Sequence, residues 1–325
     1  MSIHKVIIDT DPGVDDAAAI LMALASPEID VLGLTVVAGN VPLEDAAANA
    51  CKIVGLSGRS DVPVHAGAPG PLVRDQVFGK YARIGAFGDD LVAGSGVRPA
   101  DEHAVHFIVR KTREATEAGD PITICAIGPL TNIALALIQH PDVARGIRQV
   151  VSMGGAFTAL GHRTPWAEFN IYADPHAAEI VYRSGVSVVV MPLDMTFQAL
   201  FTQKHFERFA EEGGQAGAAL FNLFSRFDRS DIDRFGRPGG PIHDATTIAW
   251  LIRPDLFKSR KAAVGVQVTG LTKGHTYADF HQKIAHVADA TVVTDMDEAG
   301  FINLLIERIS RYGRAAPPEA KLLGG

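Results

Sequence analysis

The sequence predicts an α/β fold in which helices flank a mostly parallel central sheet and the site lies at the carboxyl ends of the strands. Short apolar runs rich in Val and Ile alternate with longer helical segments, as they do when helices connect parallel strands. Most of these runs end in small or polar loops that can converge on one crevice. The 325 residues contain no linker, low-complexity run or repeat. We therefore expect one domain over residues 1–325, with a loosely held tail over residues 313–325.

The first part of the chain alternates strands and helices. Apolar runs of the kind buried in parallel sheets predict strands at residues 6–8, 29–37, 62–65, 121–126, 149–153 and 186–191. Ala-rich or amphipathic segments between them predict helices at residues 14–24, 42–56, 102–118, 131–138 and 175–184. Two long loops are expected, over residues 67–99 and 156–173, and loops of this length in a compact domain are usually functional or disordered.

The pattern changes after residue 200. Helical periodicity predicts helices at residues 203–212, 215–227, 245–251 and 297–312. A charged loop containing Gly and Pro is expected over residues 228–241. Residues 261–294 alternate like a meander of β-strands, so the chain should end with strands and one closing helix.

The composition is that of an ordinary soluble globular enzyme, with 47 % hydrophobic and 21 % charged residues. The net charge of −7, from 30 basic and 37 acidic residues, predicts no basic patch for a nucleic-acid backbone. No apolar run has the length of a membrane span, and no signal-type segment precedes the first strand. Cys51 and Cys125 lie in apolar or helical surroundings, as reduced core thiols do. We expect a cytoplasmic protein that binds neither nucleic acid nor membrane.

Four carboxylates crowd the first strand-to-helix junction: Asp9, Asp11, Asp15 and Asp16. If the extended conformation continues past the strand, Asp9 and Asp11 point to the same face. Asp15 and Asp16 fall in the first helical turn, where backbone N–H groups and the helix dipole favour anions. Helix capping alone would explain one or two of them. Because four carboxylates at one corner repel one another, a hard divalent cation, Ca²⁺ or Mg²⁺, is the favoured interpretation.

Two further strand ends carry polar groups that could serve this corner. Asn40 follows the second strand, either as a turn-forming residue or as a donor and acceptor for a hydroxylated ligand. Residues 127–132 begin a helix after a flexible glycine. Ordinary helix initiation explains most of this segment, and an exposed main-chain carbonyl there could complete an oxygen cage for Ca²⁺.

Two groups of polar residues follow later in the chain. In an extended loop Glu168 and Asn170 would share a face, as a sugar-binding pair requires, with Phe169 between them in the core or on the ligand. His243 and Asp244 open a helix, where Asp244 could be a simple cap. Alternatively, the pair supplies another carboxylate for the metal beside a group that titrates near neutral pH.

Residues 9–16, Asp-Thr-Asp-Pro-Gly-Val-Asp-Asp, closely resemble the signature of the inosine–uridine-type nucleoside hydrolases. Further elements recur in that family's order and spacing, at residues 38–40, 128–132, 153–155, 168–170 and 243–244. The resemblance covers residues 3–312. It implies the open α/β sandwich of the nucleoside hydrolases and hydrolysis of the N-glycosidic bond of ribonucleosides to ribose and free base.

The resemblance also implies a metal site and a catalytic base. The metal would be Ca²⁺, held by Asp11, by a bidentate Asp16, by the carbonyl oxygen of Ile127 and by Asp244. Asp11 would also act as the general base, taking a proton from a Ca²⁺-bound water that attacks the anomeric carbon.

The remaining roles are implied position by position. His243 matches the histidine that assists the departure of the base. Asp9 is expected to be structural. The positions that match ribose-binding residues are Asp15, Asn40, Met153, Glu168 and Asn170.

The chain departs from the family pattern at two places. His162 stands where members often carry an Asn, which changes the chemical character of a contact to the 5′-hydroxyl. Ile84 stands where many members have the His of a His-Gly pair, so a base-side contact is missing and a pyrimidine preference is not assumed. Base recognition is instead expected from Phe169 and from the loop around Phe227, Arg234 and Phe235.

The expected substrate is a ribonucleoside, and the resemblance implies a homodimer or homotetramer. Two other functions remain open. A haloacid-dehalogenase-type phosphatase would use Asp9 as nucleophile with Mg²⁺, but no convincing downstream lysine is present and Asp15 and Asp16 come too early for its later acidic pair. A non-catalytic ribose-binding module would need neither a base such as Asp11 nor His243.

Overall fold

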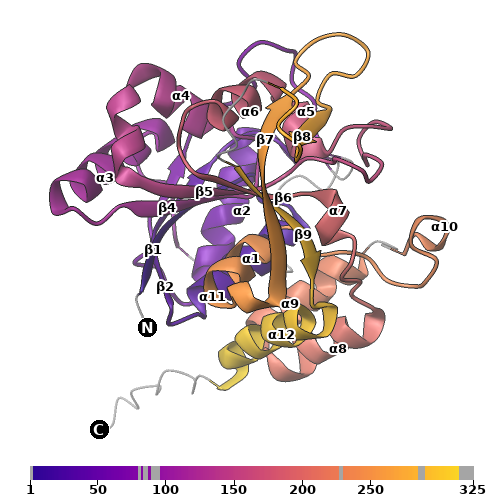
Figure 1. The fold of residues 1–325 in the computed structure, drawn as a ribbon. Coiled ribbons are helices and arrows are strands. Elements are labelled where there is room, and N and C mark those ends of the chain that lie inside the picture. Colours follow the sequence, from indigo (N-terminus) through magenta and orange to yellow (C-terminus); the bar gives the residue numbers. More distant parts are fainter. Residues whose placement is uncertain are drawn as a thin grey trace, which may run out of the picture.

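One central sheet organises the chain. The computed structural model describes residues 3–79, 82, 87–88, 96–226, 230–284 and 290–314. Its strands are β1 (His4–Thr10), β2 (Ile29–Val36), β3 (Val64–Ala66), β4 (Ile122–Ala126), β5 (Ile147–Met153), β6 (Val188–Met191), β7 (Phe257–Val266), β8 (Thr276–Asp279) and β9 (Ala290–Met296). They form a nine-stranded sheet in the order β3-β2-β1-β4-β5-β6-β9-β7-β8 (Figure 1). Neighbouring strands from β3 to β9 are parallel, and only β7 runs antiparallel to its neighbours β9 and β8.

Helices cover both faces of this sheet (Figure 1). The described helices of eight or more residues are α1 (Val14–Leu24), α2 (Leu43–Leu56), α3 (Ala104–Ala118), α4 (Thr131–Gln139), α6 (Pro175–Tyr182), α8 (Gln203–Glu212), α9 (Gly214–Ser225), α11 (Ala245–Ile252) and α12 (Glu298–Arg314). Helices α1, α2, α8, α9, α11 and α12 share a core with Val6 and Ile8, whereas α3, α4 and α6 share the other with Ile7. Since side chains alternate along a strand, the apolar start of β1 supplies both cores.

Most of the predicted elements are confirmed, with small shifts at their ends. β1 extends beyond the predicted residues 6–8 in both directions, and β5 begins at Ile147 rather than at residue 149. The predicted strand 62–65 begins at Val64. Helix α12 continues to Arg314, so the tail predicted from residue 313 is wrong at its start, and residues 315–325 lie outside the described part of the chain.

Two predictions are wrong, one about a loop and one about the order of the last strands. The loop predicted over residues 156–173 ends in a short helix, α5 (Phe169–Ala173). The last strands do not form a meander, because β9 lies between β6 and β7 and is parallel to the first and antiparallel to the second. The alternation of apolar and polar side chains predicts a strand. It does not predict which strands pair with it, because pairing depends on how the strand fits into the whole sheet.

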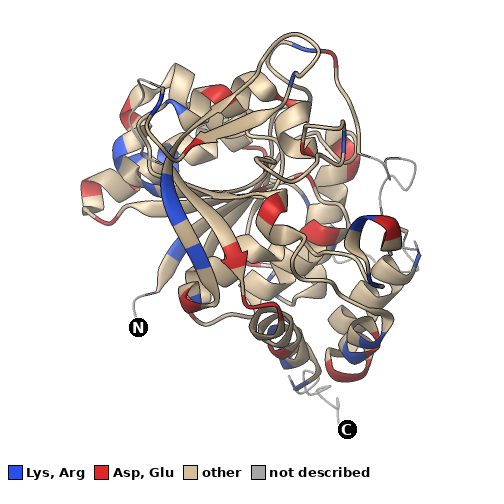
Figure 2. Cartoon of the chain, turned by 45° about the vertical axis from the view of Figure 1, so that its right-hand side comes forward, with Lys and Arg blue, Asp and Glu red and all other residues tan. Residues whose placement is uncertain are grey.

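The outer half of β7 is an exposed sheet edge with a basic surface. β8 pairs with Ala263–Val266, so among the described strands the first half of β7 has a partner on one side alone. Lys258, Arg260 and Lys261 are exposed there and form a row of positive charge (Figure 2). Such charges discourage pairing of an open edge with another chain. Elsewhere in Figure 2 acidic and basic residues are interspersed.

Two further expectations concern the thiols and the membrane. Cys51 and Cys125 are buried and form no disulfide, and burial raises the pKa of these thiols to about 11 and about 12 respectively. They are therefore the inert core thiols that the sequence predicts. In the described part of the chain, no helix combines the length and the apolar character needed to cross a bilayer.

Candidate active site

A cavity of about 630 Å³ opens at the carboxyl ends of the parallel strands β1, β2, β4 and β5. Asp11 is the one predicted site residue that does not line it; this residue is fully buried and contacts the lining residue Asn40. The predicted residues that line the cavity are Asp15, Asp16, Asn40, Ile127, Met153, His162, Glu168, Phe169, Asn170, His243 and Asp244. The fold therefore gathers residues from positions 15 to 244 into one site, as parallel strands do at their carboxyl ends.

Asp16 organises the turn between β1 and α1. Its carboxylate accepts hydrogen bonds from Thr10 Oγ1 at 2.6 Å and from the amide of Gly13 at 2.9 Å, with a longer one from Asn40 Nδ2 at 3.3 Å. The bond from Gly13 satisfies an amide at the start of α1, so the capping interpretation holds for this residue. Asp16 also lines the cavity, so capping does not account for its whole environment.

Two loops enclose the Asp11 side chain, and each approaches it so closely that only a glycine fits at the point of contact. Its Oδ2 accepts a hydrogen bond from the amide of Asn40 at 2.6 Å, whereas its buried Oδ1 has no hydrogen-bond partner among the described residues. A Cβ at Gly39 would lie 2.1 Å from Oδ2, and a Cβ at Gly128 would lie 2.7 Å from Oδ1. The loops after β2 and β4 therefore close around this carboxylate and leave one of its oxygens unsatisfied.

The buried carboxylates raise one another's pKa. Burial raises the pKa of Asp11, Asp16 and Asp244, and the charges of neighbouring carboxylates raise each of them further. Asp244 is the residue before α11, but its side chain makes no capping hydrogen bond. The capping alternative is therefore wrong for Asp244. Its carboxylate belongs to the cavity.

The candidate ligands for a hard cation are three carboxylates and one main-chain carbonyl. Over the described ranges, no three His, Cys, Asp or Glu side chains converge as a ready-made metal site. The carbonyl of Ile127 lies in the cavity wall and accepts a hydrogen bond from Asn170 Nδ2 at 3.0 Å. Asp11, Asp16, Asp244 and this carbonyl form an all-oxygen set, and the unsatisfied Oδ1 of Asp11 is the atom of that set that most lacks a partner.

Asp9 lies outside the cavity. Its Oδ2 accepts hydrogen bonds from Thr35 Oγ1 at 2.5 Å and from Asn132 Nδ2 at 2.9 Å. Burial raises its pKa to about 7 despite these two bonds. The residue ties β1 to β2 and to α4, which agrees with the structural role expected for it. A carboxylate enclosed in this way is not placed to act as the nucleophile of a phosphatase.

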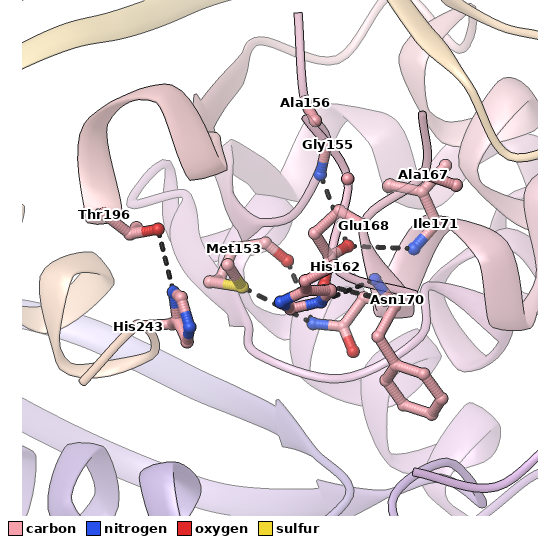
Figure 3. A network of polar contacts seen from close by, with 12 residues as sticks. Met153, Gly155, Ala156, His162, Ala167, Glu168, Asn170, Ile171, Thr196 and His243 are labelled. Atoms are coloured by element: carbon pink, nitrogen blue, oxygen red, sulfur yellow. Dashed lines mark hydrogen bonds and ion pairs between the residues drawn. The ribbon is translucent and has the colours of Figure 1, made fainter. Parts of the chain in front are cut away.

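Glu168 is positioned by the helix that the sequence does not predict. It precedes α5, and its carboxylate accepts hydrogen bonds from the amides of Asn170 at 2.9 Å and Ile171 at 3.1 Å (Figure 3). Burial alone would raise its pKa, but His162 at 3.4 Å and these amides outweigh burial and lower it. The prediction of an extended loop is wrong here, because a helix begins at Phe169. The Glu168 carboxylate before it accepts hydrogen bonds from amides of the first helical turn. Both Glu168 and Asn170 nevertheless line the cavity.

Asn170 joins the ends of two strands. Its Nδ2 donates to the carbonyl of Ile127 at 3.0 Å and to the carbonyl of Met153 at 3.1 Å (Figure 3). His162 reaches the same region from the loop before α5, where its Nε2 accepts a hydrogen bond from the amide of Phe169 at 3.0 Å. The sugar-binding residues predicted on different strands are thus held by direct contacts with one another.

His243 is brought to the acidic corner from the far end of the chain. Its amide donates to Asp15 Oδ2 at 3.0 Å, and its Nδ1 lies 2.8 Å from Thr196 Oγ1. Its ring meets the rings of His162 and Phe197 edge-on, with centroids 5.7 Å and 5.8 Å apart. The structure thus places His243 beside Asp15 and His162, and the roles of these residues stay predictions.

Aromatic side chains and the guanidinium of Arg234 line another part of the cavity. The short helices α7 (Leu193–Thr196) and α10 (Ile232–Phe235) supply it. Phe197 packs against Phe235 with centroids 5.2 Å apart, and the guanidinium of Arg234 lies 5.3 Å from the centroid of Phe197. Arg234 and Phe235 line the cavity as expected. Phe227 and Ile84, also considered for this part, lie outside the described residues.

The sequence reasoning missed Asp194, Thr196 and Phe197. All three lie just after β6. Sites form at the carboxyl ends of parallel strands, so the same argument that selected residues after the other strands could have selected these. The Asp194 carboxylate accepts hydrogen bonds from the amides of Phe157 at 2.9 Å, Thr158 at 2.7 Å and Ala159 at 3.0 Å. It therefore holds the loop that carries His162.

We expect Asp194→Asn to lower the free energy of unfolding at pH 7 by about 1–2 kcal/mol, because an amide faces donors that need an anionic acceptor. Burial raises the pKa of Asp194, but the hydrogen bonds to its carboxylate outweigh burial and lower it. A carboxyl with a lowered folded-state pKa stabilises the fold above its unfolded pKa and loses this effect as pH falls through the folded pKa. Urea titrations should therefore show the full difference at pH 7 and a smaller one as the pH falls below the unfolded pKa of about 3.9. Asp142→Asn, at an exposed carboxylate paired with Arg113, is the control and should change little. A loss that does not change with pH would contradict the assignment.

The comparisons with known proteins identify the family. The family model described as inosine-uridine preferring nucleoside hydrolase matches residues 6–303. The pyrimidine-specific ribonucleoside hydrolase RihA of Citrobacter koseri is 42% identical over 313 residues, which cover 94% of this chain and 98% of RihA.

Solved structures show the same fold. The purine-preferring ribonucleoside hydrolase from Gardnerella vaginalis superposes with a TM-score of 0.87 at 32% identity, covering 96% of this chain and 100% of its own. The plant nucleoside hydrolase PpNRh1 superposes with a TM-score of 0.84 at 32% identity, covering 97% and 99%. The family match and the fold agree, and neither a phosphatase nor a non-catalytic ribose-binding module is favoured. The chain belongs to the inosine-uridine preferring nucleoside hydrolase family and is a hydrolase of the nucleoside hydrolase class.

Proposed function

We propose that this enzyme uses Ca²⁺ to hydrolyse the N-glycosidic bond of ribonucleosides, releasing ribose and the free base. The observation that carries the proposal is the buried Asp11 carboxylate, which keeps one oxygen without a hydrogen-bond partner among the described residues while burial and neighbouring carboxylates raise its pKa. Such a group suits both a cation ligand and a proton acceptor. Its position beside Asn40, at the edge of a cavity lined by further carboxylates, supports a role at the sugar.

The residues present fit a Ca²⁺ ion. Asp11, Asp16, Asp244 and the carbonyl of Ile127 would hold it, because Ca²⁺ takes carboxylate and backbone carbonyl oxygens and relieves the repulsion among the buried carboxylates. When bound, such an ion supplies Lewis-acid chemistry, lowering the pKa of a coordinated water and offering positions for sugar hydroxyls.

The other polar residues of the cavity would bind and polarise the ribose. Asp15, Asn40, Glu168 and Asn170 present carboxylate and amide groups that suit ribose hydroxyls, beside Met153. Asp11 takes a proton from the attacking water. As the glycosidic bond lengthens, positive charge develops on the sugar, and the surrounding carboxylates stabilise it.

His243 assists the departure of the base by giving it a proton. The contacts of its ring with those of His162 and Phe197 support this role, because they place a proton donor among aromatic groups that can pack against a nucleobase. Phe169, His162 and the pair Arg234 and Phe235 contribute the remaining side chains around the substrate.

We expect reducing sugar to be released from at least one member of a panel of inosine, uridine, cytidine, adenosine and guanosine. Both base classes belong in the panel because the matched RihA is named pyrimidine-specific and the Gardnerella vaginalis enzyme purine-preferring. The 2′-deoxy analogue of the best substrate should lose at least about 100-fold in kcat/KM, because it leaves polar groups of the sugar site unpaired. No release from any nucleoside by folded, Ca²⁺-loaded protein would refute the proposal.

The proposal also includes a homodimer or homotetramer in the cytoplasm that acts on small nucleosides and binds neither nucleic acid nor membrane. Sedimentation equilibrium would measure the assembly directly. A mass equal to one 34.6 kDa chain across the micromolar range would contradict the oligomer.

A further inference from the structure

Thr196, the last residue of α7, is fully buried beside His243. Its Oγ1 lies 2.8 Å from Nδ1 of His243, and Figure 3 shows the two side chains pointing toward each other. This is the one hydrogen bond of the Thr196 hydroxyl to the described residues. A buried hydroxyl with this single contact stabilises little besides the orientation of that imidazole.

The other described contacts of His243 do not fix its ring nitrogens in the same way. The bond to Asp15 uses the main-chain amide of His243. The rings of His162 and Phe197 restrict the imidazole by edge contacts, which do not distinguish its two nitrogens. The hydrogen bond of one ring nitrogen determines which nitrogen carries the proton and where the other points. Since Thr196 engages Nδ1, the nitrogen that would serve a leaving base is Nε2.

The element that carries Thr196 is anchored independently of His243. Gln198 Nε2 donates to the carbonyls of Asp194 at 3.0 Å and Thr294 at 2.9 Å, and Gln198 Oε1 accepts from the amide of Met296 at 3.1 Å. These bonds tie the end of α7 to β9. The hydroxyl of Thr196 is therefore a fixed point against which the imidazole can be held, as a positioning group must be.

We propose that Thr196 is a positioning residue that holds His243 for protonation of the departing base. The inference rests on the proposed function. In the step concerned, the bond between the anomeric carbon and the base nitrogen breaks, and its electron pair goes to the base. The imidazolium of His243 gives the base a proton, while the water oxygen bonds to the anomeric carbon and its proton goes to Asp11. Thr196 touches neither the sugar nor the base in this step.

Thr196→Val removes the hydroxyl at nearly constant volume and should lower kcat for the best nucleoside by about 10- to 100-fold, with KM little changed. The same variant should keep kcat within about twofold on p-nitrophenyl β-D-ribofuranoside, whose nitrophenolate leaves without a proton. Thr196→Ser restores a hydroxyl and should recover most of the nucleoside activity. If Thr196→Val does not fold, Thr196→Ala provides the same comparison.

Three controls separate positioning from general damage. Thr112→Val replaces another fully buried threonine, whose hydroxyl binds carbonyls of α3, and should leave both substrates unaffected. His243→Ala should show the same selective loss on nucleosides. The double variant Thr196→Val/His243→Ala should be no slower than His243→Ala, because a residue that acts through the imidazole has nothing left to position.

The outcomes are distinguishable. Equal losses on both substrates for Thr196→Val, or additive losses in the double variant, would overturn the positioning role. So would full nucleoside activity of Thr196→Val. If His243→Ala shows no selective loss, the assignment of the leaving-base role fails first, and absence of any nucleoside cleavage by the wild-type enzyme would refute the proposed function itself.

Discussion

Asp11→Asn is expected to reduce kcat on the best nucleoside by at least about 1000-fold. An amide cannot accept the proton of the attacking water, and general-base catalysis contributes about 100- to 10,000-fold by itself. The substitution also removes a charge from the set of oxygens proposed to hold Ca²⁺. Steady-state kinetics at saturating Ca²⁺ would measure the loss, with ribose binding by calorimetry as the second readout.

The same substitution should not harm the metal-free fold. Burial and the charge of Asp16 raise the pKa of Asp11 in the folded state. A carboxyl whose pKa is raised by folding destabilises the folded state once the pH exceeds its unfolded value, near 3.9. Metal-free Asp11→Asn should therefore unfold at a higher temperature than the metal-free wild type at pH 7, and this difference should vanish below about pH 4.

Asp174→Asn is the matched control for loss of a buried carboxylate. Asp174 is also fully buried, but it binds Thr131 Oγ1 and the amides of Leu72 and Ala177 and does not line the cavity. This variant should lose stability and keep kcat within a few fold. If Asp11→Asn retained most of its activity, the base would have to be another residue.

The acidic corner could be predicted from sequence because its parts are local. Asp11 and Asp16 are separated by one turn, so their proximity follows from a strand that ends and a helix that begins. The contact between His243 and Asp15 joins residues 228 positions apart, and no local pattern determines it. Family resemblance predicted only that both residues belong to one site, and the structure supplies the contact itself.

The parts that could not be predicted depend on tertiary contacts. Helix α5 is short, and Glu168 stabilises its first turn only because the fold also brings Gly155 and His162 to the same carboxylate. The position of β9 depends on its fit between β6 and β7, which the alternation of its residues does not specify. Thr196 carries no signal in the sequence, since a threonine is informative only once its partner is known.

Removal of the metal should abolish turnover and lower the melting temperature. A ligand that binds only the folded state stabilises it by RT ln(1 + [L]/Kd), about 2.7 kcal/mol at a hundredfold excess over Kd. In a protein of 325 residues each kcal/mol changes the melting temperature by about 1.5 °C. Dialysis against EGTA followed by titration with Ca²⁺ should therefore restore activity and raise the melting temperature together, and Mg²⁺ should do so less well, since it demands a stricter geometry.

The pH dependence of this shift gives the stronger test. In the metal-free protein burial and neighbouring carboxylates raise the pKa of Asp11, Asp16 and Asp244, so protons compete with Ca²⁺ for these oxygens. Ca²⁺ should accordingly release protons as it binds, and the thermal shift should be larger at pH 8 than at pH 5.5. Asp244→Asn should lose most of the shift, whereas Asp174→Asn should keep it because that carboxylate is satisfied by its own hydrogen bonds. A shift that is independent of pH, or one that survives in Asp244→Asn, would place the cation elsewhere and separate it from the carboxylates that line the cavity.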